Sequence, residues 1–282
     1  MKPELDFAGA MRAIAASRKY RHVAPAVIER VVREAANSAG NNADLLDRAK
    51  RRLHQAFAAF VTDAELKRAG RILDELNRSE DVVASLETAA RSLLSLHAST
   101  RERATGDADF YAALWRITGI PSTLLDLGCG FHPFALPWMG LSKSTRYVAL
   151  DLDRRLLDLV GRFLARAGQP ATTIACDLAA ELPTGSADVA LALKLLPTLE
   201  RQGDGAALRF LDRVPARFVV VSFPTRSLGH HERGMDENYR RFFDSLLAAR
   251  ASHGWCAHAV PCDGELLQIV EKSSEIAATQ NQ

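Results

Sequence analysis

The sequence lacks the features of several large classes of protein. None of its apolar runs approaches the roughly 20 residues that a membrane-spanning helix needs. Its first apolar residues are interrupted by Glu4, Asp6 and Arg12, unlike those of a secretory signal peptide. The four cysteines show no Cys-x-x-Cys spacing, so neither a zinc site nor a disulfide framework is indicated. We therefore expect a cytoplasmic protein with reduced thiols, no membrane contact and no bound metal.

The composition is that of an ordinary folded protein, but its charge is unevenly distributed along the chain. The 282 residues are 48% hydrophobic and 25% charged, which suits one large domain or two modest ones. The net charge is +2, yet residues 1–71 hold 14 Lys and Arg against 8 Asp and Glu. A basic N-terminal part on a less basic remainder is typical of proteins that bind a polyanion, and equally of a solvated helix surface.

Residues 1 to about 100 show only helical patterning. In "NADLLDRAKRRLHQAFAAFV", apolar residues recur at spacings of three and four and form one stripe. The next segment, "TDAELKRAGRILDEL", begins with Thr62 and has Glu65 three residues later, which predicts a capping box. We therefore expect an all-helical domain over residues 1–100.

After about residue 120, short runs of Val, Leu and Ile alternate with helical stretches, as in a parallel sheet with crossover helices. Near the end, "WCAHAVPCDGELLQIVEK" predicts an antiparallel hairpin with Asp263-Gly264 at its tip. A doubly wound sheet that finishes on such a hairpin is the arrangement of class I methyltransferases. For residues 101–282 we therefore expect the Rossmann-like α/β fold of enzymes that use S-adenosylmethionine.

The stretch "LLDLGCGFHPFALPW" places two glycines after an acidic strand end. It fits a pyrophosphate-binding loop, a methyl-donor loop or a tight turn without a ligand. Gly128 and Gly130 permit a tight turn and a close approach to a ligand. A dinucleotide loop would have a third glycine where this chain has Pro133, so the nicotinamide interpretation is disfavoured.

Acidic residues end three successive predicted strands, and each suits one part of S-adenosylmethionine. Asp126 could face the donor's ammonium group, Asp151 could accept the ribose hydroxyls, and Asp177 could read the adenine amino group. Each acid taken singly could instead be a helix N-cap. The three together with the Gly-x-Gly loop indicate a methyl-donor pocket.

The predicted fourth strand, "ALALKLLP", lacks the groups that more demanding methyl transfers need. There is no Asn-Pro-Pro-Tyr type motif for an exocyclic amine, no nucleophilic cysteine for carbon methylation and no convergent metal-binding set. A ring nitrogen such as N7 of guanine has a free lone pair and needs only alignment with the donor. To reach a base within a helix, such an enzyme must flip it out of the stack.

Several segments resemble one family closely: "STRER", "DFYAALW", "LDLGCGFHPFALPWMG", "LKLLPTLERQ", "VVSFPTRSLG" and "GMDENY". Over nearly the whole chain the sequence is similar to the 16S rRNA (guanine-N7) methyltransferases that act at guanine 1405 and confer aminoglycoside resistance. The resemblance implies S-adenosylmethionine as cofactor, S-adenosylhomocysteine as product and 16S rRNA within the 30S subunit as partner. It also implies that the helical domain binds rRNA, and we expect a monomer. The open alternatives are methylation of adenine 1408 at N1 and a small-molecule methyltransferase.

The resemblance also assigns roles to individual residues. Arg103 would pair with the donor carboxylate, and Phe223 and Met235 would position the flipped base. The remaining donor-binding candidates, beside Asp126, are Gly128, Gly130, Asp151, Asp177, Leu178, Leu193, Glu200 and Gln202. The candidates for RNA binding are Lys19, Arg21, Lys50, Arg51, Lys67, Arg68, Arg71, Lys194, Arg226 and Arg233.

Overall fold

The computed structural model describes residues 5–57, 61–106, 108–224, 235–262 and 264–272. Within this part of the chain, seven strands form one sheet in the order β3-β2-β1-β4-β5-β7-β6. β7 runs antiparallel to β5 and β6, and the other neighbouring strands are parallel. The predicted terminal hairpin is thereby confirmed. The strands are β1 (Thr123–Leu127), β2 (Arg146–Asp151), β3 (Ala171–Ala175), β4 (Ala187–Leu193), β5 (Ala216–Pro224), β6 (Cys256–Val260) and β7 (Glu265–Glu271).

The order of the strands reverses at β1. Leu124 pairs with Tyr147 of β2 on one side and with Val189 of β4 on the other. In open α/β sheets, ligands bind beside the carboxyl ends of the strands at this reversal. The end of β1 is therefore the place where the fold predicts a binding site.

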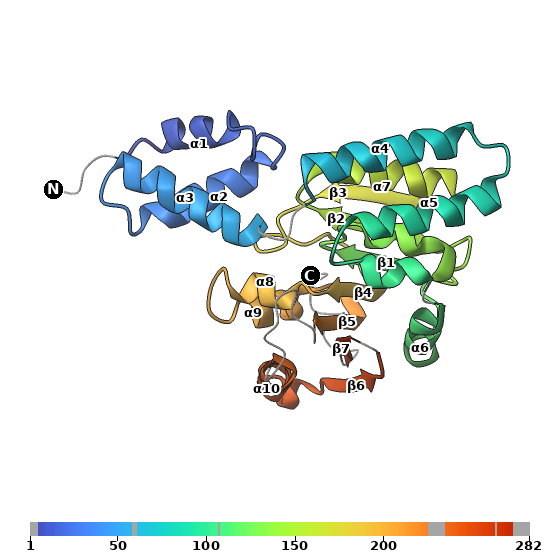
Figure 1. The fold of residues 1–282 in the computed structure, drawn as a ribbon. Coiled ribbons are helices and arrows are strands. Elements are labelled where there is room, and N and C mark those ends of the chain that lie inside the picture. Colours follow the sequence, from blue (N-terminus) through green and yellow to red (C-terminus); the bar gives the residue numbers. More distant parts are fainter. Residues whose placement is uncertain (1–4, 58–60, 107, 225–234, 263, 273–282) are drawn as a thin grey trace.

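Helices cover both faces of the sheet (Figure 1). One face carries the long helices α4, α5 and α7, and the other carries α8, α9 and α10. The elements around the first face are α4 (Asp63–Arg78), α5 (Val82–Leu96), η1 (Arg101–Thr105), α6 (Ala108–Thr118), η2 (His132–Trp138) and α7 (Arg154–Arg166). Those on the other side are α8 (Leu196–Glu200), α9 (Ala206–Arg213), α10 (Met235–Ala248) and the short η3 (Ala251–His253).

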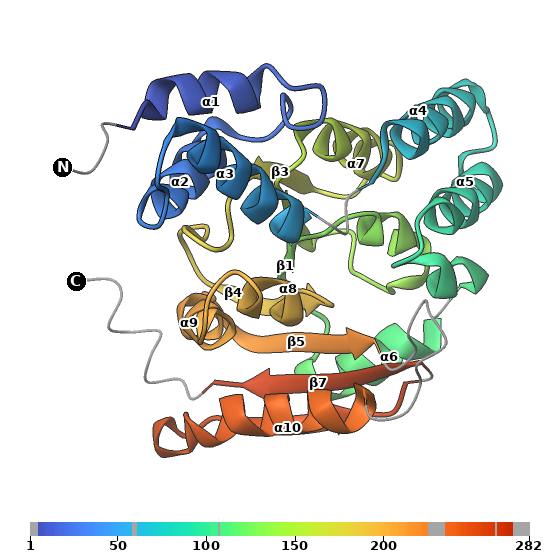
Figure 2. The ribbon, with the colours of Figure 1, turned by 60° about the vertical axis from the view of Figure 1, so that its left-hand side comes forward.

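The first three helices form a group with its own hydrophobic core, here called the helical module. They are α1 (Phe7–Ala15), α2 (Pro25–Ala36) and α3 (Asn42–Phe57). Their apolar stripes meet through residues such as Ile14, Val32 and Leu53, none of which is exposed. Figure 2 shows these three helices beside the sheet and apart from α4 and α5. The apolar pattern in the sequence is thus the pattern of a small three-helix core.

The two following helices share the core of the sheet. The predicted capping box of α4 is present, with Thr62 and Glu65 bonded reciprocally. Leu73 of α4 and Leu93 of α5 belong to the same apolar cluster as strand residues of β1 and β2. A domain boundary near residue 100 stays a prediction, and the change from one core to the other falls between α3 and α4. No helix in the described ranges is long and apolar enough to span a membrane.

Candidate active site

A cavity of about 170 Å³ lies beside the carboxyl ends of β1, β2 and β4, where the strand order reverses. Its walls hold most of the residues predicted to bind a methyl donor, namely Gly128, Gly130, Asp151, Asp177, Leu178, Leu193 and Gln202. Three further segments also contribute walls. They are helix α2, helix α8 and the turn that follows α5. The fold thus brings together, around one cavity, strand-end residues that the sequence analysis had identified one by one.

The glycine loop after β1 has a backbone that other residues adopt only with strain. Gly128 and Gly130 have φ angles of +66° and +51°. A Cβ on Gly128 would also lie 3.2 Å from Cδ1 of Leu195 on the opposite wall. Both glycines are therefore needed to turn the chain beneath the cavity.

Asp151, the last residue of β2, holds this loop in place. Its Oδ2 accepts a hydrogen bond from the Gly130 amide at 3.0 Å, and its Oδ1 accepts from Leu152 and Asp153 at 2.7 and 3.1 Å. Burial raises the pKa of Asp151, against the lowering effect of these three amides. A carboxylate has about four acceptor positions. One acceptor position on Oδ2 therefore remains available to a ligand in the cavity.

Asp126, the other acid of this segment, does not line the cavity. Its Oδ2 accepts hydrogen bonds from the Tyr147 hydroxyl at 2.5 Å and from His132 Nδ1 at 2.8 Å, and the residue is buried. Successive side chains of a strand point to opposite faces. Asp126 therefore shares the face of Leu124, beneath η2, which the sequence pattern alone did not distinguish from the ligand side. A contact with the donor's ammonium group receives no support from this arrangement.

A buried ionic cluster lies at the edge of the cavity. Arg103 Nη2 donates to both oxygens of Glu265, at 2.9 and 3.0 Å, and its guanidinium lies 4.0 Å from the centre of the Phe110 ring. Lys194 Nζ lies 2.9 Å from Glu265 and 2.6 Å from Glu102. Arg103, assigned by resemblance to the donor carboxylate, thus has a carboxylate partner in this chain. Lys194, assigned to RNA, lines the cavity, and its φ of +57° is unusual for a residue other than glycine.

Glu265, which the sequence analysis did not single out, contacts the cavity wall through Lys194. Burial would raise the pKa of Glu265, but the charges of Arg103 and Lys194 lower it from 4.5 to about 2. A carboxyl group whose pKa is lower in the folded state stabilises the fold above its unfolded pKa, and this contribution is lost as the pH falls through the folded value. Below pH 4.5 the unfolded chain takes up this proton before the folded protein does, so stability is expected to fall progressively towards pH 2.

Replacing Glu265 with glutamine tests this cluster. The variant removes the carboxylate charge that pairs with the buried guanidinium of Arg103, so we expect a loss of about 3 kcal/mol at pH 7, as for other broken buried ion pairs. Urea unfolding at pH 7 and at pH 3 measures the difference, which should shrink at the lower pH. The exposed pair of Arg33 and Glu29 offers a control, since Glu29→Gln should change stability little at either pH. An equal loss at both pH values would contradict the assigned charge interaction.

The other residues predicted for the donor and the base lie in different surroundings. Glu200 accepts from the amides of Gly205 and Ala207 at 2.6 and 2.9 Å, so its carboxylate anchors the start of α9 outside the cavity. Phe223 is fully buried and stacks on Tyr239 of α10, as part of the core. Met235 begins α10, but its side chain lies outside the described structure.

Apart from Lys194, the described basic residues predicted to bind RNA fall into two groups. On the helical module, Lys19 contacts His54 at 2.9 Å, Arg21 contacts His22, and Arg51 pairs with Asp47. Lys50 is exposed on the same module. The second group is on α4 and faces solvent, and Arg226 and Arg233 lie outside the described residues.

The group on α4 borders a basic groove of about 690 Å³. Its walls include Arg68 and Arg71 from α4 together with Arg91 and Arg101, and Lys67 is exposed on the same helix. Arg91 and Arg101 were not singled out from the sequence, although Arg101 belongs to the quoted segment "STRER". Packing of α4 against α5 creates this concentration of positive charge.

Among the described residues, one set of side chains offers metal-ligating atoms close together: Cys256, His258 and Glu271. They lie on the β6–β7 hairpin and do not line the cavity. Glu271 also pairs with Arg217 at 2.8 Å. The expectation that the protein holds no metal stays a prediction.

The strand order, the single reversed strand and the acid-lined cavity define the fold of class I S-adenosylmethionine-dependent methyltransferases. Within that class, the chain belongs to the FmrO family of ribosomal RNA methyltransferases, whose family model matches residues 16–269.

Curated relatives match over most of their length. The chain is 38% identical over 264 residues to a 16S rRNA (guanine(1405)-N(7))-methyltransferase of Micromonospora echinospora, covering 93% of this chain and 95% of the relative. It is 39% identical, with the same coverage, to the enzyme of that name from Micromonospora rosea. The sequence resemblance is thereby confirmed at the level of the family.

Solved structures agree with this assignment. The 16S rRNA methyltransferase RmtF, in complex with S-adenosyl-L-homocysteine, superposes with a TM-score of 0.79 at 31% identity, covering 95% of this chain and 98% of that one. The 16S rRNA methylase RmtB superposes with a TM-score of 0.77 at 27% identity, covering 96% of this chain and all of that one. Both matches cover the helical module as well as the sheet.

Proposed function

We propose that this protein transfers a methyl group from S-adenosylmethionine to N7 of guanine 1405 in 16S rRNA of the 30S subunit. Modification at this position removes an aminoglycoside contact, so the activity confers resistance in the cytoplasm of the cell that carries it. The observation that supports this most strongly is the likeness to guanine-1405 N7 methyltransferases over about nine-tenths of both chains. The protein acts as a monomer, without a metal ion.

The residues around the cavity fit the donor. Asp151 has a free acceptor position for a ribose hydroxyl, and Asp177 with its neighbour Leu178 offers an acceptor and an apolar surface for adenine. The glycine loop brings backbone close to this space without a Cβ. When bound, S-adenosylmethionine supplies an electrophilic methyl group on a sulfonium ion.

The chain's own contribution to the reaction is alignment and exclusion of water. N7 of guanine has an in-plane lone pair and no proton to lose, so the site requires no general base. The new bond forms from that lone pair, and the electrons of the breaking carbon–sulfur bond remain on sulfur. Positioning of this kind supplies several kcal/mol by itself, about 7 at the lower end for well-oriented reactions. The cavity walls do carry titratable side chains, among them His97, Asp151 and Asp177. Methyl transfer to N7 requires none of them to act as a general base.

The test is to incubate 30S subunits with tritiated S-adenosylmethionine and to map the modified base. We expect one methyl group at N7 of guanine 1405, and resistance in cells that express the protein. A methyl group at N1 of adenine 1408 would replace the proposal by the sister activity. Transfer to small molecules with none to 30S would show that the acceptor is not ribosomal RNA.

A further inference from the structure

The guanidinium of Arg30 extends from α2 of the helical module to the end of β3. Its Nε lies 2.6 Å from Oδ2 of Asp177, and its Nη2 lies 3.3 Å from Oδ1. The two side chains are 20% and 5% exposed, and 147 residues separate them in the sequence. Such a two-point contact fixes the plane of a carboxylate as well as its charge. Arg30 therefore determines how Asp177 faces the cavity.

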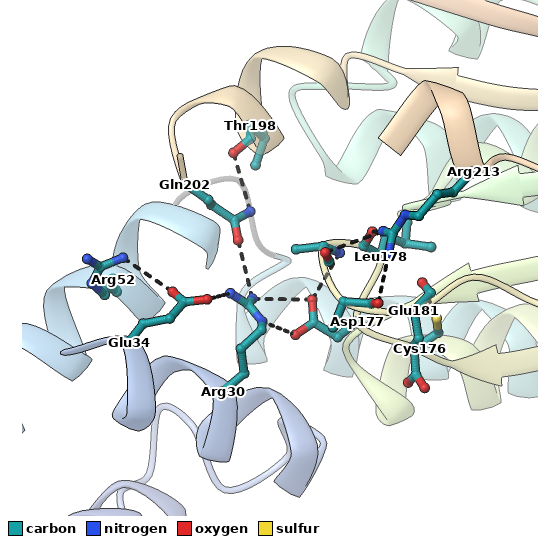
Figure 3. Close-up of polar contacts among 12 residues, drawn as sticks. Arg30, Glu34, Arg52, Cys176, Asp177, Leu178, Glu181, Thr198, Gln202 and Arg213 are labelled. Atoms are coloured by element: carbon teal, nitrogen blue, oxygen red, sulfur yellow. Dashed lines mark hydrogen bonds and ion pairs between the residues drawn. The ribbon is translucent and has the colours of Figure 1, made fainter. Parts of the chain in front are cut away.

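The same guanidinium also contacts the opposite wall of the cavity. Nη2 of Arg30 lies 3.3 Å from Oε1 of Gln202, whose amide nitrogen donates to the carbonyl of Thr198. On the module side, Nη1 donates to Glu34 at 2.8 Å, and Glu34 also accepts from Arg52 of α3. Figure 3 shows Arg30 between Glu34 on one side and Asp177 and Gln202 on the other. The contacts form one chain from the core helices of the module to the donor cavity.

The hydrogen-bond count at Asp177 leaves room for one more partner. Arg30 occupies one acceptor position on each oxygen, and the Ala179 amide occupies a second position on Oδ1. Of about four positions on a carboxylate, one remains, on Oδ2. This leaves space for a single donor such as the 6-amino group of adenine.

We infer that Arg30 is a positioning residue at the adenine end of the donor site. Through Arg30, the helical module and the methyltransferase core form this end of the site together. This inference rests on the proposed function. By fixing Asp177 and Gln202, Arg30 sets the preference for a 6-amino purine. Because it is anchored in the module that carries Lys19, Arg21, Lys50 and Arg51, it also couples donor binding to RNA docking. Coupling of this kind is reciprocal, so each ligand strengthens the binding of the other by the same factor.

Arg30→Ala tests the inference, with Arg33→Ala as its matched control. Arg33 lies on the same helix, is 72% exposed and pairs with Glu29, so both variants remove one arginine from α2. Calorimetry measures binding of S-adenosylhomocysteine and of S-inosylhomocysteine, in which a carbonyl replaces the 6-amino group. We expect Arg30→Ala to lose about tenfold or more in affinity for the adenosyl compound, in line with loss of a charged hydrogen-bond contact.

The selectivity between the two compounds separates positioning from a structural role. In the wild type, the carbonyl of the inosyl compound faces the Asp177 carboxylate, so the adenosyl compound binds more tightly. Arg30→Ala should narrow this ratio, whereas general damage to the fold would weaken both compounds alike. Arg30→Lys keeps the charge but not the two-point contact, so it should fold normally and narrow the ratio as well. An unchanged ratio in both variants, or tighter adenosyl binding, would overturn the inference.

The second measurement uses 30S subunits. In the wild type and in Arg33→Ala, saturating S-adenosylhomocysteine should tighten 30S binding about fivefold or more. In Arg30→Ala this factor should fall towards one. If S-adenosylhomocysteine tightened 30S binding by Arg30→Ala as much as it does for the wild type, the coupling would be refuted. Failure of the wild type to bind S-adenosylhomocysteine or to methylate 16S rRNA would instead refute the proposed function, so the two failures are distinguishable.

Discussion

Asp151→Ala is expected to weaken the binding of S-adenosylhomocysteine by about 10- to 100-fold, the effect of losing a hydrogen bond to a charged group. Two losses combine in this variant. The free position on Oδ2 no longer accepts a ribose hydroxyl, and the Gly130 amide loses the oxygen that holds the glycine loop. Isothermal calorimetry gives the affinity directly. Methylation of 16S rRNA at limiting donor should fall in parallel, because the change acts on donor binding.

Asp188→Ala is the matched control for this prediction. Oδ2 of Asp188 accepts from the amides of Ser122 and Thr123 at 2.7 and 2.9 Å. This contact lies where β1 begins, at the end of the strands opposite the cavity. Asp188 therefore has the same kind of carboxylate–amide contacts without access to a ligand. We expect a small loss of stability and an unchanged donor affinity. If the two variants bound the donor equally well, Asp151 would have only a structural role.

The sequence indicated the sheet and most of the strand-end residues because these features are local. Runs of Val, Leu and Ile, the Asp-Gly turn and the two glycines follow from conformational preferences of neighbouring residues. Since parallel strands place their carboxyl ends along one edge, Asp151 and Asp177 could be expected to meet. The pattern could not decide whether the side chain of Asp126 lines the cavity, so it gave Asp126 the same weight as the other two.

The contacts that the sequence did not indicate join distant parts of the chain. Arg30 meets Asp177 across 147 residues, and Arg103 meets Glu265 across 162. In its own segment each of these four residues looks like an ordinary charged residue. Only the folded arrangement of the chain brings the two members of each pair together. Arg30 has one recognisable signal, since its side chain emerges beside the apolar stripe of α2, next to buried Val31. That signal identifies an interface but not its partner.

Charge reversal of Lys67, Arg68 and Arg71 to glutamate should abolish methylation of 16S rRNA while leaving donor affinity intact. The three side chains are exposed on α4. Two of them line the groove that also contains Arg91 and Arg101. Removing three phosphate contacts should weaken 30S binding about 100-fold or more. The slope of the logarithm of the binding constant against the logarithm of salt concentration should become less steep by about 2 to 3.

A second triple variant removes the same charge elsewhere. Arg116, Lys143 and Arg146 are also exposed, but they lie near the amino ends of β1 and β2, at the edge of the sheet opposite the cavity. Their reversal to glutamate changes the net charge equally, so a long-range electrostatic effect would lower 30S affinity in both variants. A docking role for α4 requires that only the first variant lose affinity and salt dependence. If filter binding at several salt concentrations showed equal losses, the groove would act through overall charge and the contact surface would lie on another part of the molecule.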